Sequence, residues 1–269
     1  MRARHLAILV LFLAAPVATA RQQPAASAAP QAASAPSSSK IWLGRNAEFE
    51  AFLRDAPFKR VEDVPIGVTS PQRGYFEPGG LVASAAWKQL PPGRPNGYWE
   101  SYKSEIAAYE LDKLLGLGMV PPAVEKRHQH ERGAAVLWVE GVRSWKAVEN
   151  APKPPKWNRE AVRMKMFDNL IANIDRNAGN LLVDNDWNLY LIDHSRAFVT
   201  DTKLRAEMVR IDKEIWDGMA ALDEPTLTAA LGKWLDRGMI RAILKRRDAM
   251  KKVIDNLLKN GNEALVYIK

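Results

Sequence analysis

NIDRNAGNLLVDNDWNLYLIDHSRAF, residues 173–198, is the stretch that decides the fold. It combines four Asp and five Asn residues with two apolar runs. Leu181–Val183 and Leu189–Ile192 are short runs of the kind found in strands, and the turn residues DNDWN between them predict a β-hairpin. Because a hairpin brings its outer ends together, we expect Asn180 and Asp193 to lie close in space.

Asp175 lies five residues before Asn180, just after a helix is expected to end. Three oxygen-bearing side chains would then converge at one end of the hairpin. Carboxylate and amide oxygens suit a hard cation such as Mg²⁺ or Mn²⁺. A carboxylate beside that cation can orient a hydroxyl group and accept its proton. Phosphoryl transfer needs this combination of metal, positioning and charge neutralisation, so the spacing predicts that chemistry.

Two other interpretations of the same stretch remain open. Asp184, Asp186 and Asn188 alternate like the first ligands of a calcium loop, but such a loop would need Gly at position six and Glu at position twelve. Leu189 and Ser195 stand there instead, which favours an ordinary hairpin turn. In the second interpretation, the polar residues of the 175–180 segment only cap loops.

The first 40 residues are not expected to belong to the folded domain. Residues 1–20 combine a basic start, the apolar run LAILVLFLAA and the small residues Ala18-Thr19-Ala20, which predict a cleaved signal peptide; an uncleaved membrane anchor is the alternative. Residues 21–40 are rich in Ala, Pro and Ser and predict a disordered linker. The chain has no cysteine, so an exported protein would fold without disulfide bonds.

The rest of the chain divides into two parts with different patterns. In residues 41–142, short apolar segments separated by Gly and Pro predict a small sheet, with one main helix over residues 98–118. Residues 143–269 predict mainly helices, the first of them capped by Asn158. Three more are expected at residues 203–222, 224–235 and 238–259. The prediction is an α+β fold with a β-rich N-terminal lobe and a helical C-terminal lobe, and clefts between such lobes are favoured ligand sites.

The chain also resembles a known family. DRNAGN (175–180) followed by LYLIDHSRAF (189–198) resembles the catalytic and metal-binding loops of the atypical kinase superfamily, which includes the phosphatidylinositol 3- and 4-kinases. SEIAAYELDKLLGLGMVPPAV (104–124) and GGLVASAAWKQL (79–90) resemble segments of the secreted Golgi casein kinase family within it. The resemblance covers roughly residues 61–200 and implies a two-lobed protein-kinase-like fold.

The resemblance implies a role for each matching residue. Lys88 would contact the nucleotide phosphates, and Glu105 would pair with Lys88 or help to hold metal. Asp175 would be the catalytic base, and Asn180 and Asp193 would bind the metal. The alternative for Glu105 is a solvated charge at a helix start, which leaves Glu100 and Glu110 as substitutes.

The resemblance implies nucleotide contacts in two further places, where the sequence matches the family's motifs less closely. GVTSPQRG (67–74) replaces the usual glycine-rich loop, and there Thr69, Ser70 and Arg73 would cover phosphates; a plain surface turn is the alternative. Trp138 falls where a kinase hinge holds adenine, although core packing explains it too. His194 is expected to be a packing residue, and Arg196 either meets substrate or faces solvent.

The leading functional prediction is an exported kinase that uses ATP and Mg²⁺ or Mn²⁺ to phosphorylate a hydroxyl group on a protein or glycan. An inactive pseudokinase that binds nucleotide or protein, and a lipid kinase, are the alternatives. The predicted compartment is periplasmic or extracellular. The net charge is +8, and its densest cluster, KRRDAMKK (245–252), predicts either a solvated helix face or contact with an acidic partner or membrane surface. No nucleic-acid partner is expected, and the sequence does not indicate an oligomeric state.

Overall fold

The computed structural model describes residues 40–64, 72–95 and 97–268. The predicted signal peptide, all of the predicted linker except Lys40, and the predicted phosphate contacts Thr69 and Ser70 lie outside these residues. Lys40, the last residue of the predicted linker, is buried in the described part of the chain. No helix in the described part of the chain has the length and apolar character needed to cross a membrane.

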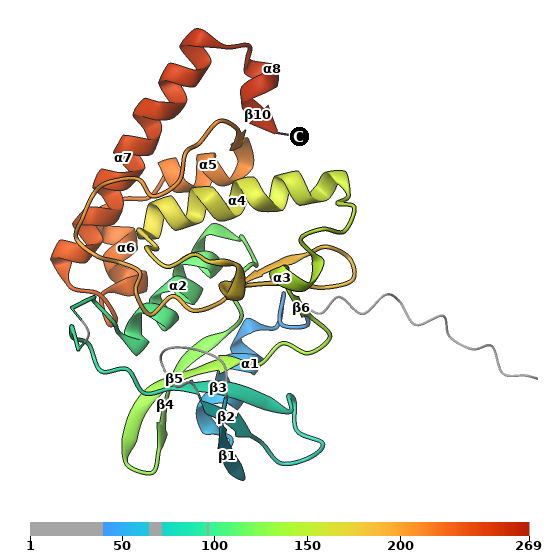
Figure 1. Ribbon diagram of the computed structural model, residues 1–269. Coiled ribbons are helices and arrows are strands. Elements are labelled where there is room, and N and C mark those ends of the chain that lie inside the picture. Colours follow the sequence, from blue (N-terminus) through green and yellow to red (C-terminus); the bar gives the residue numbers. More distant parts are fainter. Residues whose placement is uncertain (1–39, 65–71, 96, 269) are drawn as a thin grey trace, which may run out of the picture. The chain divides into compact units, whose positions relative to one another are not determined.

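The N-terminal lobe is a five-stranded antiparallel sheet with two helices packed against it (Figure 1). The strand order is β1-β2-β3-β5-β4. The strands are β1 Arg60–Asp63, β2 Gln72–Tyr75, β3 Ser84–Lys88, β4 Ala123–His128 and β5 Glu131–Leu137, and the helices are α1 Asn46–Asp55 and α2 Tyr102–Leu115.

Strand β3 separates two hydrophobic cores because its side chains alternate between the faces of the sheet. Ala85 and Trp87 point into the smaller core beside α1, whereas Ala86 packs against the larger core that contains α2. Lys88 has the same parity as Ala86 and therefore faces α2 and the second lobe.

Helix α2 starts later than the predicted residue 98. The Ser101 hydroxyl accepts a hydrogen bond from the backbone N–H of Lys103 and caps the helix, and Gly116 ends it in a left-handed conformation (φ 64°). The residues before the cap form a loop instead, held by backbone hydrogen bonds between Gly93 and Glu100. The cap fixes Glu105 in the first turn of the helix, close to the sheet.

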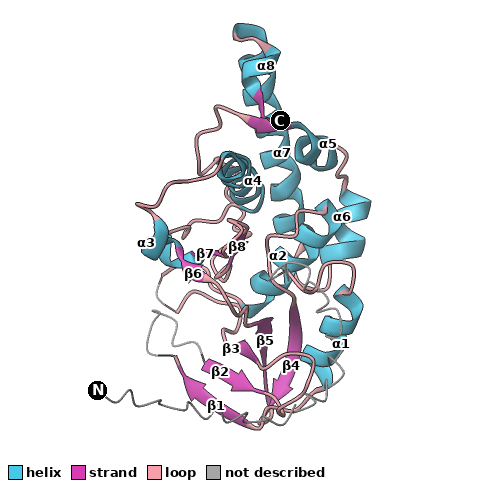
Figure 2. Cartoon of the chain, turned by 90° about the vertical axis from the view of Figure 1, so that its right-hand side faces the viewer, coloured by secondary structure: helices cyan, strands magenta, loops and turns pink. Residues whose placement is uncertain are grey.

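The C-terminal lobe is mainly helical, as predicted (Figure 2). A small sheet in the order β6-β7-β8 lies between α4 and the N-terminal lobe, and a parallel pair joins β9 to β10 near the end of the chain. The helices are α3 Trp145–Val148, α4 Pro155–Ile171, α5 Lys213–Ala220, α6 Glu224–Leu231, α7 Arg237–Asn260 and α8 Glu263–Val266. The strands are β6 Arg143–Ser144, β7 Leu181–Val183, β8 Leu189–Leu191, β9 Ile211–Asp212 and β10 Tyr267–Ile268.

Several predicted helix limits need correction. Helix α4 begins at Pro155 rather than after Asn158, because proline is well suited to the first turn. The helix predicted over residues 203–222 is only α5, capped by Asp212. Asp223 caps α6, which begins at residue 224 as predicted. Asn46 is the first residue of α1 and makes no side-chain cap.

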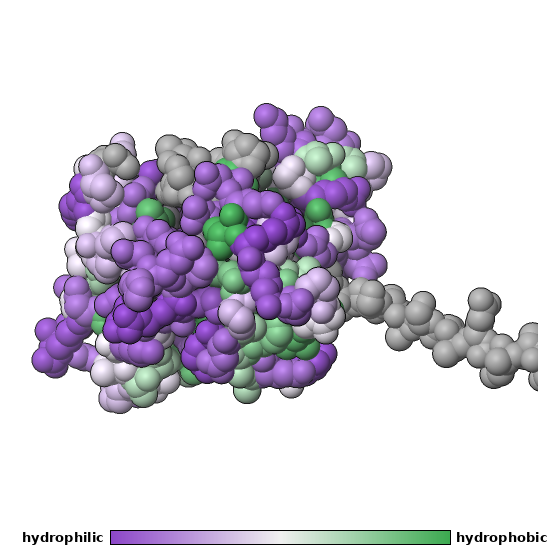
Figure 3. Space-filling view, turned by 90° about the horizontal axis from the view of Figure 1, so that it is seen from below, coloured by the Kyte–Doolittle hydropathy of each residue, from purple (hydrophilic) through white to green (hydrophobic). Residues whose placement is uncertain are grey.

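The basic cluster on α7 is only partly a surface feature. Arg246 is fully buried and donates hydrogen bonds to the carbonyl oxygens of Leu170, Val199 and Asp201. It therefore holds the chain that follows the hairpin instead of facing a membrane or an acidic partner. Seen from the side of the N-terminal lobe, the surface is mostly hydrophilic with small separate hydrophobic patches (Figure 3).

Candidate active site

The predicted hairpin forms and brings Asn180 next to the residues that follow β8. Strands β7 and β8 pair in antiparallel register with Leu181 opposite Leu191, and the backbone N–H of Ile192 donates to the Asn180 carbonyl at 3.2 Å. The turn between the strands is held by Asp184, whose carboxylate accepts from the backbone N–H groups of Asp186 and Asn188. This is an Asx-type hairpin turn, as the absence of calcium-loop residues predicted.

Asparagine side chains shape the loop that precedes the hairpin. The Asn173 side-chain oxygen accepts from the backbone N–H of Asp175, and the Asn177 side-chain oxygen accepts from that of Gly179. The side-chain amide of Asn180 donates to the Asp175 carbonyl at 2.9 Å. Short polar side chains thus satisfy backbone groups that no strand or helix would pair, and they fix Asp175 relative to Asn180.

Arg176 locks this loop to the helix and to the hairpin. Its guanidinium makes two bonds to the buried Asp168 carboxylate of α4, at 2.9 and 3.0 Å. It also donates to the carbonyl oxygens of Asn180 and Ile192, at 2.8 and 2.9 Å. Sequence reasoning missed this residue, because no local spacing links Arg176 to a helix residue eight positions earlier.

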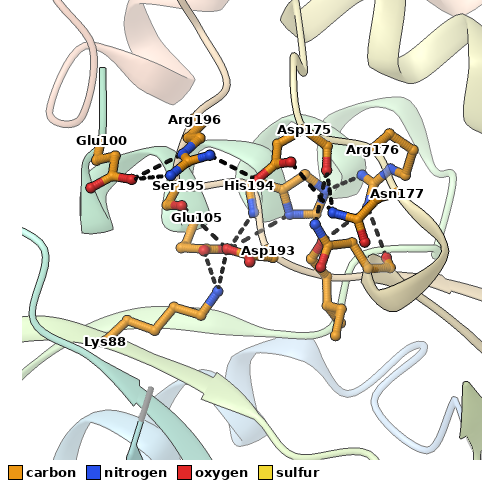
Figure 4. Close-up of polar contacts among 12 residues, drawn as sticks. Lys88, Glu100, Glu105, Asp175, Arg176, Asn177, Asp193, His194, Ser195 and Arg196 are labelled. Carbon is orange, nitrogen blue, oxygen red and sulfur yellow. Dashed lines mark hydrogen bonds and ion pairs between the residues drawn. The ribbon is translucent and has the colours of Figure 1, made fainter. Parts of the chain in front are cut away.

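Lys88 joins the two lobes through a pair of carboxylates (Figure 4). Its ammonium lies 2.5 Å from Glu105 and 2.9 Å from Asp193. Burial opposes the charge on Lys88, but the neighbouring Glu105 and Asp193 outweigh it and raise its pKa. The pKa of Glu105 is lowered, because Lys88 and His194 overcome the desolvation of a carboxylate that is only 2% exposed.

Glu105 is therefore the partner of Lys88 in the structure, and the two substitutes are not. Glu100 pairs with Arg196, and Glu110 pairs with Lys113. The solvated helix-start interpretation of Glu105 is wrong, because the side chain is buried against the segment that follows β8.

His194 is a packing residue, as predicted. Its backbone N–H donates to Glu105 at 3.0 Å, and its ring lies between Glu105 and Arg176. Burial is the main cause that lowers its pKa, so the imidazole is neutral near pH 7.

Asp175 points toward the open side of the site. Its side chain is 37% exposed, and one carboxylate oxygen lies 3.3 Å from the Arg196 guanidinium. Arg196 in turn donates to Glu100 from two nitrogens, at 2.9 and 2.7 Å. Arg196 is thus an ion-pair residue between two carboxylates, rather than a simple solvent-facing residue.

The backbone around the site contains uncommon conformations. Asp193 and Phe198 have positive φ angles of 59° and 63°, although neither is glycine. Such residues cost on the order of 1–3 kcal/mol each and persist where the surroundings fix them. Lys88 and Ser195 hold the Asp193 carboxylate, and the Phe198 N–H donates to the Ile171 carbonyl at 2.7 Å.

The two predicted metal ligands leave suitable atoms available. Because the Asn180 amide nitrogen bonds to the Asp175 carbonyl, its side-chain oxygen is turned away from that bond. Asp193 uses Oδ1 for Lys88 and Ser195, and among the described residues its Oδ2 makes no hydrogen bond, so a cation could bind there. In the described ranges no group of three or more His, Cys, Asp or Glu residues forms a metal cage. Two oxygens suit a hard cation that takes its other ligands from phosphate and water.

Trp138 lies apart from the ion pairs. It follows β5 directly, donates its backbone N–H to the Ser84 carbonyl, and stacks under the Arg73 guanidinium at 4.2 Å. It lines a groove of about 520 Å³ that reaches the hairpin turn at Asp186, and this groove includes neither Lys88 nor Asp193. Its predicted contact with adenine stays a prediction.

Comparison with known proteins adds information at the level of fold. No protein-family model and no curated protein sequence matches the chain. A crystal structure of the Golgi casein kinase matches 83% of this chain and 77% of that one, with 16% identity and a TM-score of 0.61. A hydra Fam20 structure with sugar matches 82% and 91% of the two chains, with 15% identity and a TM-score of 0.63.

A further structure of the Golgi casein kinase, with Mn and ADP bound, covers 82% of this chain and 77% of its own length. Its identity is 15% and its TM-score 0.56. The predicted two-lobed kinase-like fold is confirmed, and so is the resemblance to the Golgi casein kinases as a likeness of fold. The roles of Lys88, Glu105, Asp175, Asn180 and Asp193 stay predictions, now with a geometry that brings them into one site.

Proposed function

We propose that this protein is a kinase that transfers the γ-phosphoryl group of ATP to a hydroxyl group. The observation that carries this proposal is the chain of contacts from Lys88 to Glu105 and Asp193, with Asp175 and Asn180 fixed beside it. If the Lys88–Glu105 ion pair served only stability, there would be no need for the partly exposed Asp175 carboxylate or for the side-chain oxygens of Asn180 and Asp193 beside it.

Each residue of this set of contacts has a task in the reaction. Lys88 holds the phosphates of the nucleotide, and Glu105 keeps the ammonium in place. Asp175 orients the acceptor hydroxyl and takes its proton, while the hydroxyl oxygen bonds to the γ-phosphorus. The bond from that phosphorus to the β–γ bridging oxygen breaks, and ADP leaves with the electron pair.

Asn180 and Asp193 are the residues that would hold the metal. When bound, Mg²⁺ or Mn²⁺ supplies positive charge to the phosphate oxygens. Two structures of similar fold, a Golgi casein kinase with Mn and ADP bound and a hydra Fam20 with sugar, support the choice of nucleotide, metal and a protein or glycan acceptor. Export through the N-terminal segment is part of the same proposal and is supported by the sequence pattern of residues 1–20.

The test compares nucleotide binding with turnover in three matched variants. Thermal unfolding of the wild-type protein is followed with ATP and MnCl₂, and ADP release is measured with a serine-containing peptide, a disaccharide or water as acceptor. Saturation at about 100 times the dissociation constant stabilises the native state by roughly 2.7 kcal/mol. We expect Asp193→Asn to lose the metal-dependent shift, and Asp175→Asn to keep the shift but lose ADP release.

Asp255→Asn is the matched control, because it removes the same charge from an exposed position on α7, outside the site and outside the groove lined by Trp138. It should behave like the wild type in both measurements. A wild-type shift without ADP release would identify a pseudokinase, and a requirement for phosphoinositide vesicles would identify a lipid kinase. The absence of any nucleotide-dependent shift would refute the proposed function.

A further inference from the structure

Arg196 lies between a buried carboxylate and the carboxylate proposed as the catalytic base. Two of its nitrogens contact one oxygen of Glu100, at 2.9 and 2.7 Å, and the third reaches Asp175 at 3.3 Å. The Glu100 side chain is almost fully buried, whereas that of Asp175 is partly open to solvent. The buried acid therefore anchors the guanidinium, and the anchored guanidinium limits where the Asp175 carboxylate can point.

Glu100 is itself held in place by the backbone around it. It exchanges two backbone hydrogen bonds with Gly93, at 3.0 and 2.9 Å. The next residue, Ser101, caps helix α2 and donates its backbone N–H to the Ser195 carbonyl at 2.9 Å. Ser101 follows Glu100 and Ser195 precedes Arg196, so this backbone hydrogen bond holds the two residues of the Glu100–Arg196 pair close together.

The start of helix α2 thus reaches the site through two parallel chains of charges, which Figure 4 shows side by side. One runs from Glu105 through Lys88 to Asp193, and the other from Glu100 through Arg196 to Asp175. The first chain ends on a predicted metal ligand. The second ends on the predicted base, and no sequence pattern predicts this second chain.

We propose that Arg196, anchored by Glu100, is a positioning residue that holds the Asp175 carboxylate toward the acceptor hydroxyl. This inference rests on the proposed function. The groups that face the Asp175 side chain in the described residues are the Arg196 guanidinium and the Asn177 side-chain amide, at 3.3 and 3.4 Å. Only Arg196 carries a charge, so its contact is the one expected to fix the direction of the Asp175 carboxylate.

The experiment measures ADP release and nucleotide binding separately in Arg196→Gln, Glu100→Gln and the double variant. We expect Arg196→Gln to lower kcat by roughly 10- to 100-fold, a part of the effect that a general base contributes. Its dissociation constant for ATP with Mn²⁺ should stay within about twofold of the wild-type value, because no contact of Lys88 changes. Arg241→Gln removes an exposed arginine far along the chain and serves as the control.

Two readouts separate positioning from a merely structural role. The double variant should be no slower than Arg196→Gln alone, because both residues act through the same contact with Asp175. Added guanidinium chloride at millimolar concentration should restore part of kcat in Arg196→Ala. Wild-type kcat in Arg196→Gln, additive losses in the double variant, or a loss confined to nucleotide affinity would each overturn the inference. A wild-type protein that binds ATP with Mn²⁺ but releases no ADP would refute the proposed function, and this inference with it.

Discussion

Several small polar side chains between Asn173 and Phe198 form hydrogen bonds with backbone groups, and others are candidates for a role in catalysis. Asn173, Asn177 and Asp184 accept hydrogen bonds from backbone N–H groups in three tight turns. In the loop before the hairpin, Asn180 is bonded to Asp175, and Asp193 follows β8 at that same end of the hairpin. The abundance of Asp and Asn beside apolar strands thus has two causes, since turns need them locally and the site needs two or three of them globally.

Lys88 gives a prediction at the scale of single residues. Lys88→Met leaves the buried Glu105 carboxylate without its cation, and breaking a buried ion pair from one side costs about 3–5 kcal/mol. We expect the free energy of unfolding, measured by urea titration at pH 7, to fall by that order. The second change Glu105→Gln should recover a large part of the loss, because it removes the uncompensated charge.

One result for Lys88→Met would contradict this prediction. If Lys88→Met were as stable as the wild type, Glu105 would have another partner or would be protonated, and the ion pair would not organise the site. Lys103→Met is the control, since Lys103 lies in the same helix turn and its side chain makes no ion pair in the described residues.

At the scale of elements, Asp212 connects three parts of the C-terminal lobe. It ends β9, caps α5 through the backbone N–H of Ile215, and accepts hydrogen bonds from Arg159 and Arg163 of α4, at 2.6 and 2.8 Å. The Asp212 carboxylate thus ties together the start of α5, the end of β9 and the two arginines of α4. The helix predicted over residues 203–222 fails for this reason, because the cap position decides where α5 begins.

Asp212 also predicts a pH dependence of stability. Burial would raise its pKa, but the two arginines and the cap hydrogen bond outweigh burial and lower it below the ordinary value of 3.8. A lowered pKa in the folded state means that the stabilisation is present above pH 3.8 and is lost as the pH falls through the folded-state pKa. Asp212→Asn keeps the cap but loses the charge, so we expect a loss of about 2 kcal/mol at pH 7.

The measurement is urea unfolding of both proteins at pH 7 and near pH 3. The difference between wild type and Asp212→Asn should shrink at the lower pH; a constant difference would mean that the charge is not its source. Asp217→Asn is the control, because Asp217 pairs with Lys213 on an exposed face of the same helix and should change stability little.

At the scale of the whole folded part, the sequence predicted the order of strands and helices better than the residues at which the helices begin. The α+β division, the order of strands and helices, and the hairpin that brings Asn180 next to the end of β8 were predictable, because apolar periodicity and turn residues are local signals. The contacts of Glu100 and Arg246 were not predictable, because their partners lie far away in the chain. The contact of Arg176 with Asp168 was not predictable either, because no local pattern links a loop residue to a helix residue eight positions earlier. The starts of α2 and α4 differ from the predicted ones by several residues, because the Ser101 cap and Pro155 decide those boundaries.

Trp42 gives the prediction that concerns how the lobes hold together. It is 1% exposed and meets Tyr190 of β8 edge to face, with 5.9 Å between ring centroids. Tyr190 belongs to the hairpin of the C-terminal lobe but packs in the core beside α1, so Trp42 helps to join that hairpin to the N-terminal sheet. Burying a tryptophan in such a core is worth about 3–5 kcal/mol relative to alanine.

We therefore expect Trp42→Ala to lower the free energy of unfolding by roughly 3 kcal/mol, measured by urea titration. The neighbouring Leu43 is 51% exposed, and Leu43→Ala should cost less than about 0.5 kcal/mol. Because the hairpin also carries Asp193, the loss in Trp42→Ala should weaken the ATP- and Mn²⁺-dependent thermal shift as well. A variant that is less stable yet binds nucleotide with unchanged affinity would show that Trp42 supports the N-terminal core alone and does not help to fix the hairpin beneath it.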